Sequence, residues 1–210
     1  MPEIYRSRML ENPAYALTDT ARIQDLVTRH SWVTLVSHLP TGLVVSHAPI
    51  LAEPDHSIVG HLARVDADSH ELGQHDVVVI VQGPHGYITP DWYVGGPYVP
   101  TWNFVVCHLH GRPDLLTADE TYDVLSRTVD HYEQARPKPF RLDQVTQYAQ
   151  QLAPHTTGFR LVPSRVVAKA KLSQDKPAAD QAGVLTGLDA DQVHANPELA
   201  ATMRSYGVGR

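Results

Sequence analysis

A short amphipathic helix is predicted near the N-terminus by apolar residues that recur three to four positions apart. Thr18 or Asp19 stands before the first of them and can cap the helix by accepting a backbone N–H. The positions on the apolar stripe are Ile23, Leu26, Val27 and His30. After this helix the pattern of the chain changes.

Five runs rich in β-branched residues follow, and turn or charged residues separate them. The first two runs predict a hairpin, because Pro40 and Gly42 mark a turn between them. The fourth run is continuously apolar, which is typical of a strand buried on both faces. The expected strands are 32–37, 42–51, 57–65, 76–83 and about 102–110.

Helical spacing returns past the fifth run. Thr117 and Glu120 form a capping-box signature, and Pro137 and Pro139 end the helix that follows. Its apolar face carries Tyr122, Leu125, Val129 and Tyr132. Asp143 is expected to cap a second helix. The apolar residues of that helix are Val145, Tyr148 and Leu152.

The last third of the chain predicts a strand pair and two short helices. Residues 158–173 read as a returning pair of strands, and Pro163 confines at least one of them to an edge or a bulge. Helices are expected at about 177–186 and about 196–205.

The succession of elements favours a mainly β fold of the α+β kind. Many short strands with frequent turns, followed by helices that can pack outside, predict a small β-barrel with peripheral helices. A doubly wound α/β sheet is disfavoured, because the first five strands follow one another with no helix expected between them. The length of 210 residues favours one domain.

Composition narrows the class of protein. The chain is 42% apolar and 19% charged, as in soluble globular proteins, and it has no apolar stretch long enough for a membrane helix. Its first residues lack the apolar core of a signal peptide, and Cys107 is the only cysteine, so a reducing cytoplasm is the expected location. The net charge of −6 disfavours direct DNA binding, which requires a basic surface.

Rigid side chains gather between residues 83 and 104. Gly83, Pro84 and Gly86 predict a tight turn that leaves His85 and Tyr87 at a rim. The rings that follow are Trp92, Tyr93, Tyr98, Trp102 and Phe104. Flat ligands stack on such rings, so the segment predicts the wall of a cofactor pocket, although the same rings can serve as core and loop anchors.

Histidines in or beside strands are the candidate metal ligands. His61 and Arg64 lie three residues apart on an expected strand, so their side chains should point to opposite faces. His108 and His110 share one strand face, but no third ligand stands near them and no HExxH motif occurs. A single His suffices to bind haem iron, because the porphyrin supplies the other four nitrogens.

Two further features carry weaker signals. Lys171 and Ser173, within the basic run 169–176, can bind phosphate, or can simply protect an edge strand from aggregation. Cys107 lies in the middle of a strand and is expected to be a small buried hydrophobe. The chain contains no GxSxG, Walker-type or GxGxxG motif.

Six blocks of sequence resemble, in order, the signature blocks of the PaiB family. They are SHAPI at 46–50, GHLAR at 60–64, GPHGYITPDWY at 83–93, VPTWNF at 99–104, HYE at 131–133 and KAKLSQDKP at 169–177. The resemblance runs to about residue 188. It implies an FMN-binding-type split β-barrel over 1–188 with a C-terminal helical tail over 189–210, and a homodimer with cofactor sites at the subunit interface.

The resemblance leaves three functions open. Most members of the family are described as FMN-binding negative transcriptional regulators. One branch comprises haem-dependent piperazate synthases, which close N5-hydroxyornithine into a ring through an N–N bond. A third reading is a non-catalytic barrel that serves in protein interactions.

Two departures from the family pattern fall on the expected pocket rim. After GHLAR the family usually continues with an Asn-Pro-Gln-Trp run, whereas this chain has VDADSH at 65–70. After WY many members carry a Lys before VPTW, whereas this chain has VGGPY at 94–98. Both changes favour a specialised pocket over a standard flavin site.

Carried onto this chain, the resemblance implies a role for each candidate residue. In the haem reading, which we favour, His61 binds the iron of haem b, Arg64 contacts a propionate, and the substrate is a small amine or hydroxylamine. Tyr87 and Asp91 are the candidate catalytic groups. In the FMN reading, Arg64, Thr89 and Lys171 surround the phosphate. The remaining expected cofactor contacts are Trp92, Tyr93, Thr101, Trp102, Phe104 and Ser173.

Overall fold

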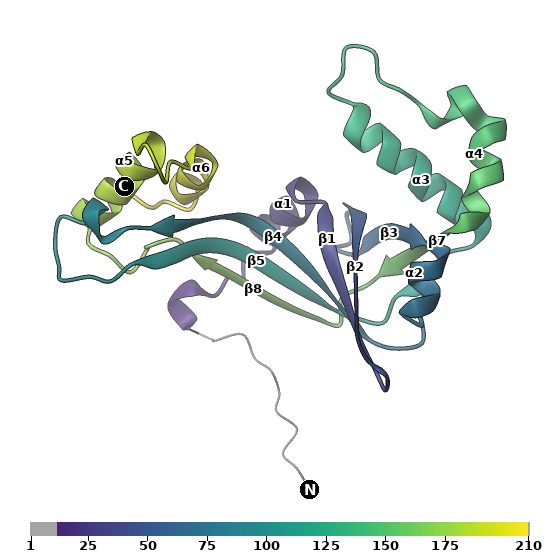
Figure 1. Ribbon diagram of the computed structural model, residues 1–210, viewed down its shortest axis with the longest axis horizontal. Coiled ribbons are helices and arrows are strands. Elements are labelled where there is room, and N and C mark those ends of the chain that lie inside the picture. Colours follow the sequence, from purple (N-terminus) through teal and green to yellow (C-terminus); the bar gives the residue numbers. More distant parts are fainter. Residues whose placement is uncertain (1–11, 210) are drawn as a thin grey trace, which may run out of the picture. The chain divides into compact units, whose positions relative to one another are not determined.

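A computed structural model describes residues 12–209 (Figure 1). Within this range, eight strands form one sheet in the order β6-β7-β3-β2-β1-β4-β5-β8. The strands are β1 (Trp32–Leu39), β2 (Gly42–Ala52), β3 (Ile58–Ala63), β4 (Val77–Ile88), β5 (Thr101–Gly111), β6 (Asp114–Leu115), β7 (Thr156–Leu161) and β8 (Arg165–Lys171). The predicted mainly β fold is confirmed.

Six α-helices and four 3₁₀ turns accompany the strands within the described residues. The helices are α1 (Thr20–Arg29), α2 (Arg64–Ser69), α3 (Ala118–Glu133), α4 (Thr146–Leu152), α5 (Ala178–Ala190) and α6 (Pro197–Ser205). The 3₁₀ turns are η1 (Pro13–Tyr15), η2 (Pro90–Trp92), η3 (Leu142–Val145) and η4 (Ala153–His155). No helix among the described residues is long and apolar enough to cross a membrane.

The chain divides into two compact units, which are described separately below. The first unit comprises Met1–Thr18 as far as it is described, Gly83–Val106 and Ala168–Arg210, again within the described range. The second unit comprises Asp19–Gln82 and Cys107–Val167. The domain prediction, a barrel over 1–188 with a tail over 189–210, stays a prediction.

The second unit is built on the predicted β1–β2 hairpin. Trp32 pairs with Pro49 at one end of the ladder and Leu39 pairs with Gly42 at the other. β3 joins β2 on one side and β7 on the other. Helix α3 packs on β7 at Gly158, where an added Cβ would lie 2.6 Å from the hydroxyl oxygen of Thr121. Only glycine therefore lets the helix approach this strand so closely.

The first unit is organised by α5 and α6, which pack against each other. The Asp180 carboxylate at the start of α5 accepts the backbone N–H groups of Val94 and Gly95 at 2.7 and 2.8 Å, and so holds the loop before β5. Gly187 lies under the indole of Trp92, where a Cβ would overlap the ring. Gly183, where a Cβ would overlap the Trp92 carbonyl oxygen, and Gly187 form the glycine face of α5, and this face contacts η2.

Sequence signals at the helix starts are confirmed where the cap is local. Asp19 accepts the N–H groups of Ala21 and Arg22, and Thr117 with Glu120 forms the predicted capping box. The prediction that Asp143 caps α4 was wrong. Asp143 lies inside η3, and the N-cap of α4 is Val145, which makes no side-chain hydrogen bond there. A 3₁₀ turn occupies the positions where the cap was expected.

Two further predictions about local structure were wrong. Gly83, Pro84 and Gly86 form no turn, because β4 runs straight through them to Ile88. Gly86 instead allows a close approach, since a Cβ there would lie 3.0 Å from a methyl group of Leu199 in α6. The strand expected over 57–65 ends at Ala63, and Arg64 is the first residue of α2.

The position of Arg64 corrects the expectation about its direction. The alternation of faces along a strand does not extend into a helix, so Arg64 and His61 do not lie on opposite faces of one strand.

The predicted pairing of the two strands within 158–173 was also wrong. Both strands exist, but β7 pairs with β3 and β6, whereas β8 lies next to β5 at the edge of the sheet.

Candidate functional site

A small pocket of about 190 Å³ in the first unit brings together several predicted cofactor contacts. Tyr93 and Thr101 line it with Lys171 and Ser173. The other lining residues are Tyr15, Tyr98, Val99, Pro100, Asn103, Asp175 and Lys176. We call this the Lys171 pocket.

Two lysines give the Lys171 pocket its positive charge. The Lys171 ammonium donates to the Thr101 hydroxyl and, at 3.1 Å, to the carbonyl oxygen of Trp102. Burial lowers the pKa of Lys171, while nearby Asp175 opposes the shift. Lys176 lies 4.7 Å from the centre of the Tyr98 ring and pairs with the Asp175 carboxylate at 3.3 Å. Both ammonium groups are therefore fixed at the pocket by neighbouring side chains.

A buried polar atom at this pocket lacks a partner. The side chain of Asn103 is completely buried, and its amide nitrogen donates to the Ser173 hydroxyl at 2.9 Å. Its Oδ1 atom accepts no hydrogen bond from any described residue. Ser173 adopts a φ of 62°, which residues other than glycine rarely adopt. Unsatisfied buried groups and unusual backbone angles of this kind gather at binding sites.

An exposed ring lies beside further aromatic groups in the same unit. Trp102 is 47% exposed, and its indole N–H donates to Nδ1 of His85 at 3.2 Å. The His85 and Trp102 rings are stacked with their centres 6.0 Å apart. Tyr87 meets Trp102 edge-on and lies 4.9 Å from His194. This cluster leaves an indole surface open for a flat group.

The other candidates of the first unit have local structural contacts. Thr89 caps η2 by accepting the backbone N–H of the exposed Asp91. Trp92 packs on α5 and donates to Asp191 at 3.3 Å. The ring of Phe104 lies 5.8 Å from the Lys169 ammonium. Trp92 therefore anchors η2 to α5.

His61 and Arg64 belong to the second unit. His61 lies opposite Gly158 in the β3–β7 ladder and is half-buried. Its Nδ1 is buried without a partner among the described residues, and burial lowers the pKa of the ring. The imidazole is therefore neutral at pH 7, the form that coordinates a metal.

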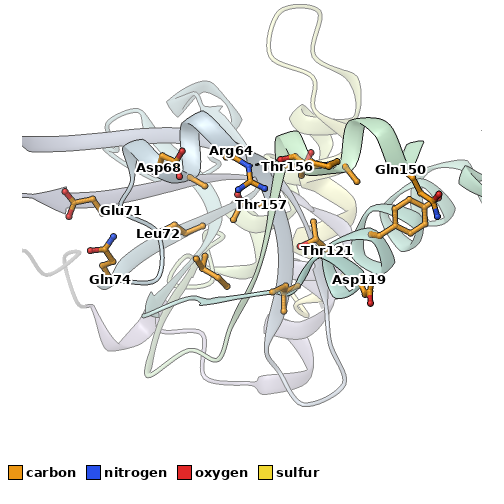
Figure 2. A pocket seen from close by; sticks show the side chains of 17 residues that line it. Arg64, Asp68, Glu71, Leu72, Gln74, Asp119, Thr121, Gln150, Thr156 and Thr157 are labelled. Atoms are coloured by element: carbon orange, nitrogen blue, oxygen red, sulfur yellow. Dashed lines mark hydrogen bonds between the residues drawn. The ribbon is translucent and has the colours of Figure 1, made fainter. Parts of the chain in front are cut away.

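Arg64 lines a larger cleft of about 800 Å³ in the second unit (Figure 2). Its Nε donates to the carbonyl oxygen of Pro154 at 2.7 Å. The cleft lies against α2, α3 and β7, which provide Asp68, Thr121 and Thr157. The predicted site residues therefore divide into His61 and Arg64 in the second unit and ten residues in the first.

The two remaining titratable candidates form no metal site. The ring centres of His108 and His110 lie 6.4 Å apart, and no group of three or more His, Cys, Asp or Glu suited to a metal occurs in residues 12–209. Cys107 is fully buried, as predicted, and burial raises the pKa of its thiol to about 12. The thiol is therefore unreactive at neutral pH.

Sequence reasoning missed Asn103, Lys176 and Tyr15 at the Lys171 pocket. Asn103 carried a usable signal. It occupies the same face of β5 as Val105, Cys107 and Leu109, which are all buried. A lone amide in a row of buried apolar residues marks a position where a polar partner is needed.

Comparison with known proteins identifies relatives over most of the chain. The model of the family described as "Putative FMN-binding domain" matches residues 9–165. The chain is 27% identical over 194 residues to the protease synthase and sporulation protein PAI 2 of Bacillus subtilis, covering 90% of this chain and 93% of that protein.

Solved structures share the fold. A FAD- and haem-binding protein from Mycobacterium smegmatis matches with a TM-score of 0.58 at 14% identity, over 79% of this chain and 78% of that one. The flavocytochrome Anf3 from Azotobacter vinelandii matches with a TM-score of 0.56 at 16% identity, over 74% and 68%. The predicted split β-barrel with peripheral helices is thereby confirmed.

Proposed function

Because the chain belongs to the PaiB family of FMN-binding split barrels, we propose that it binds FMN and holds the phosphate of that cofactor in the Lys171 pocket. The observation that carries this proposal is the set of donors in the pocket. Two lysine ammonium groups stand with the hydroxyls of Thr101 and Ser173 against the single carboxylate of Asp175, and such a cationic set suits a phosphate.

The neutral end of the pocket suits the rest of the cofactor. Oδ1 of Asn103 requires a hydrogen-bond donor, and the ribityl chain of a flavin carries hydroxyl groups that can donate. Trp102 alternates with Thr101 and Asn103 along β5, so its exposed indole lies on the other face of the strand, away from the Lys171 pocket. Bound flavin supplies hydride or electron transfer, and these side chains orient it.

A homodimer is part of the proposal. In the second unit, one face of the β1–β2 hairpin exposes Trp32, Leu43 and Val45 by 64%, 69% and 55%. Large apolar side chains exposed on one sheet face are typical of an interface. The net charge of −6 argues against direct DNA contact, so any regulatory role rests on protein or small-molecule partners.

The test compares FMN with riboflavin, which lacks the phosphate. Lys171→Met should weaken FMN binding by about 10- to 100-fold, the effect of losing a charge-assisted hydrogen bond, and leave riboflavin affinity unchanged. Fluorescence titration measures both. The exposed Lys138→Met is the matched control. Equal FMN affinity in the variant and the wild type, or no flavin binding at all, would overturn the proposal.

A second candidate function rests on His61. We propose as the alternative that the chain binds haem b through this neutral imidazole, whose buried Nδ1 lacks a partner, and closes a hydroxylamine of the N5-hydroxyornithine type. In that reaction an N–N bond forms, the N–O bond breaks, and the hydroxyl leaves as water after accepting a proton. Haem would supply an iron Lewis acid for the leaving oxygen.

In this alternative the protein must also move protons. Tyr87 and Asp91, the candidate groups for taking the proton of the attacking amine, belong to the first unit, so this alternative rests on His61 alone. A Soret band near about 400 nm in freshly purified protein, lost in His61→Ala, is the expected result. Flavin bands without a Soret band would exclude the alternative, and no chromophore at all would favour a non-catalytic interaction protein.

A further inference from the structure

We propose that the cleft of the second unit binds a zwitterionic small molecule that carries a carboxylate at one end and an amine at the other. All residues that line this cleft belong to the second unit, whereas the Lys171 pocket lies in the first. His61 is not among the residues that line the cleft either, so the proposal stands whether the cofactor is FMN or haem.

Arg64 provides the anion-binding group. Its guanidinium is oriented through Nε, which donates to the Pro154 carbonyl oxygen at 2.7 Å. No described residue accepts a hydrogen bond from its two terminal nitrogens. Figure 2 shows the guanidinium in the middle of the cleft, between Asp68 and Thr157. An arginine fixed by one nitrogen and open at the other two is prepared for bidentate binding of a carboxylate.

Carboxylates lie on both sides of that guanidinium. In Figure 2, Glu71 lies toward one end of the cleft and Asp119 toward the other. The side chains of Asp68 and Asp119 form no hydrogen bond or ion pair with a described residue, whereas Glu71 meets His75 at 2.6 Å. The carboxylates of Asp68 and Asp119 are therefore available to bind an ammonium group.

The charges exclude simpler ligands. Three carboxylates against one guanidinium disfavour a dianion such as a free phosphate, because like charges repel in a partly enclosed site. A plain amine would leave the guanidinium unpaired. A zwitterion satisfies both groups.

The cleft also has an apolar part that suits an aliphatic chain. Ala67 and Leu72, which are 4% and 5% exposed, form an apolar part of the lining. Thr156 and Thr157 add hydroxyls beside it. A volume of about 800 Å³ is within the usual range of small-molecule sites.

Three matched probes test the proposal by calorimetry on the full chain at low salt. 6-Aminohexanoate has both charges, hexylamine lacks the carboxylate, and hexanoate lacks the amine. 6-Aminohexanoate should bind at least about tenfold more tightly than either of the others, because each end contributes a charge-assisted hydrogen bond. Equal binding of hexylamine would overturn the proposal in favour of a plain cation site.

Variants locate the two ends. Arg64→Gln should reduce affinity for 6-aminohexanoate to that for hexylamine, and Asp68→Asn combined with Asp119→Asn should reduce it to that for hexanoate. The exposed Asp143→Asn, outside the cleft, should leave binding unchanged. The Asp68 and Asp119 variants keep the test decisive if Arg64→Gln does not fold. Unchanged affinity in those variants, or no binding of any probe to the wild type, would overturn the proposal.

Discussion

The two units differ in how they treat buried polar groups. In the first unit, the polar interior is concentrated at the Lys171 pocket, where lysines meet hydroxyls and an amide oxygen without a partner. In the second unit, the buried polar residues are hydroxyl side chains and one histidine, His70. Burial lowers the pKa of His70 and also of the half-buried His61, His108 and His110.

From this difference we expect the stability of the first unit to depend on a bound ligand and that of the second unit to depend on pH. A small cationic pocket with an unsatisfied amide is stabilised when an anion with hydroxyl groups binds it. Buried neutral imidazoles instead lower the stability of the folded state at acidic pH, because the unfolded state then binds more protons. The ligand response and the acid response should therefore belong to different parts of the chain.

Gly187→Val is expected to have the largest effect on stability. The new side chain on α5 collides with the indole of Trp92, so we expect a loss of about 2–3 kcal/mol in the free energy of unfolding. Urea denaturation followed by fluorescence measures it, and FMN affinity should fall with it. The exposed Thr186→Ala, one residue earlier, is the control. A variant as stable as the wild type would show that η2 does not depend on the glycine face of α5.

Acidification is expected to have a smaller effect, through the second unit. A histidine whose pKa is lowered by folding binds fewer protons in the folded state, so its full stabilisation is present above the unfolded pKa of about 6.5 and is lost as pH falls below it. The urea concentration at the midpoint of unfolding should therefore decrease as the pH is lowered from 7 to 5.

His70 is the group to change in this test. It is completely buried, and its Nδ1 lies 2.7 Å from the Ser37 hydroxyl. His70→Asn, which can keep that hydrogen bond, should flatten the decline, whereas the exposed His56→Asn should not. A pH profile identical in the His70 variant and the wild type would contradict this origin of the acid response.

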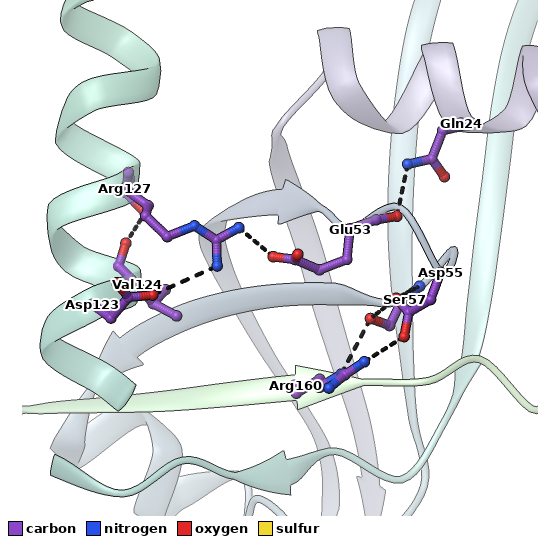
Figure 3. Close-up of polar contacts among 9 residues, drawn as sticks. Gln24, Glu53, Asp55, Ser57, Asp123, Val124, Arg127 and Arg160 are labelled. Carbon is purple, nitrogen blue, oxygen red and sulfur yellow. Dashed lines mark hydrogen bonds and ion pairs between the residues drawn. The ribbon is translucent and has the colours of Figure 1, made fainter. Parts of the chain in front are cut away.

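Arg127→Met is expected to have the smallest effect. Arg127 on α3 pairs with Glu53 in the β2–β3 turn, and with Asp123 at 3.6 Å (Figure 3). Its side chain is 41% exposed, so solvent weakens the pair and we expect a loss of at most about 1 kcal/mol in thermal or urea unfolding. A loss as large as that of Gly187→Val would mean that the second unit depends on its surface ion pairs.

Local signals predicted the elements well. The caps at Asp19 and Thr117 depend on residues within one helical turn, and both were confirmed. The β1–β2 hairpin follows from alternation and its turn residues. Gly83 and Gly86 misled the same reasoning, because glycine marks close packing as readily as a turn, and at Gly86 the neighbour is Leu199 of α6.

The candidate site was only partly predictable. Thr101, Lys171 and Ser173 were identified from the sequence and meet at one pocket. The amide of Asn103 was missed, since its need for a partner follows from complete burial, which depends on contacts with distant residues. The free ends of Arg64 were also beyond sequence reasoning, because Pro154, which orients that guanidinium, lies 90 positions away.

The sequence by itself determined the mainly β class, the helix starts and the residues rich in chemistry, because these depend on periodicity and on neighbours a few positions away. Only the tertiary structure decided that β4 lies beside β1, that Trp92 packs on α5, and that the predicted site residues divide between two units. The physical reason is that burial and pairing are set by contacts between residues far apart in the chain, which no local pattern records.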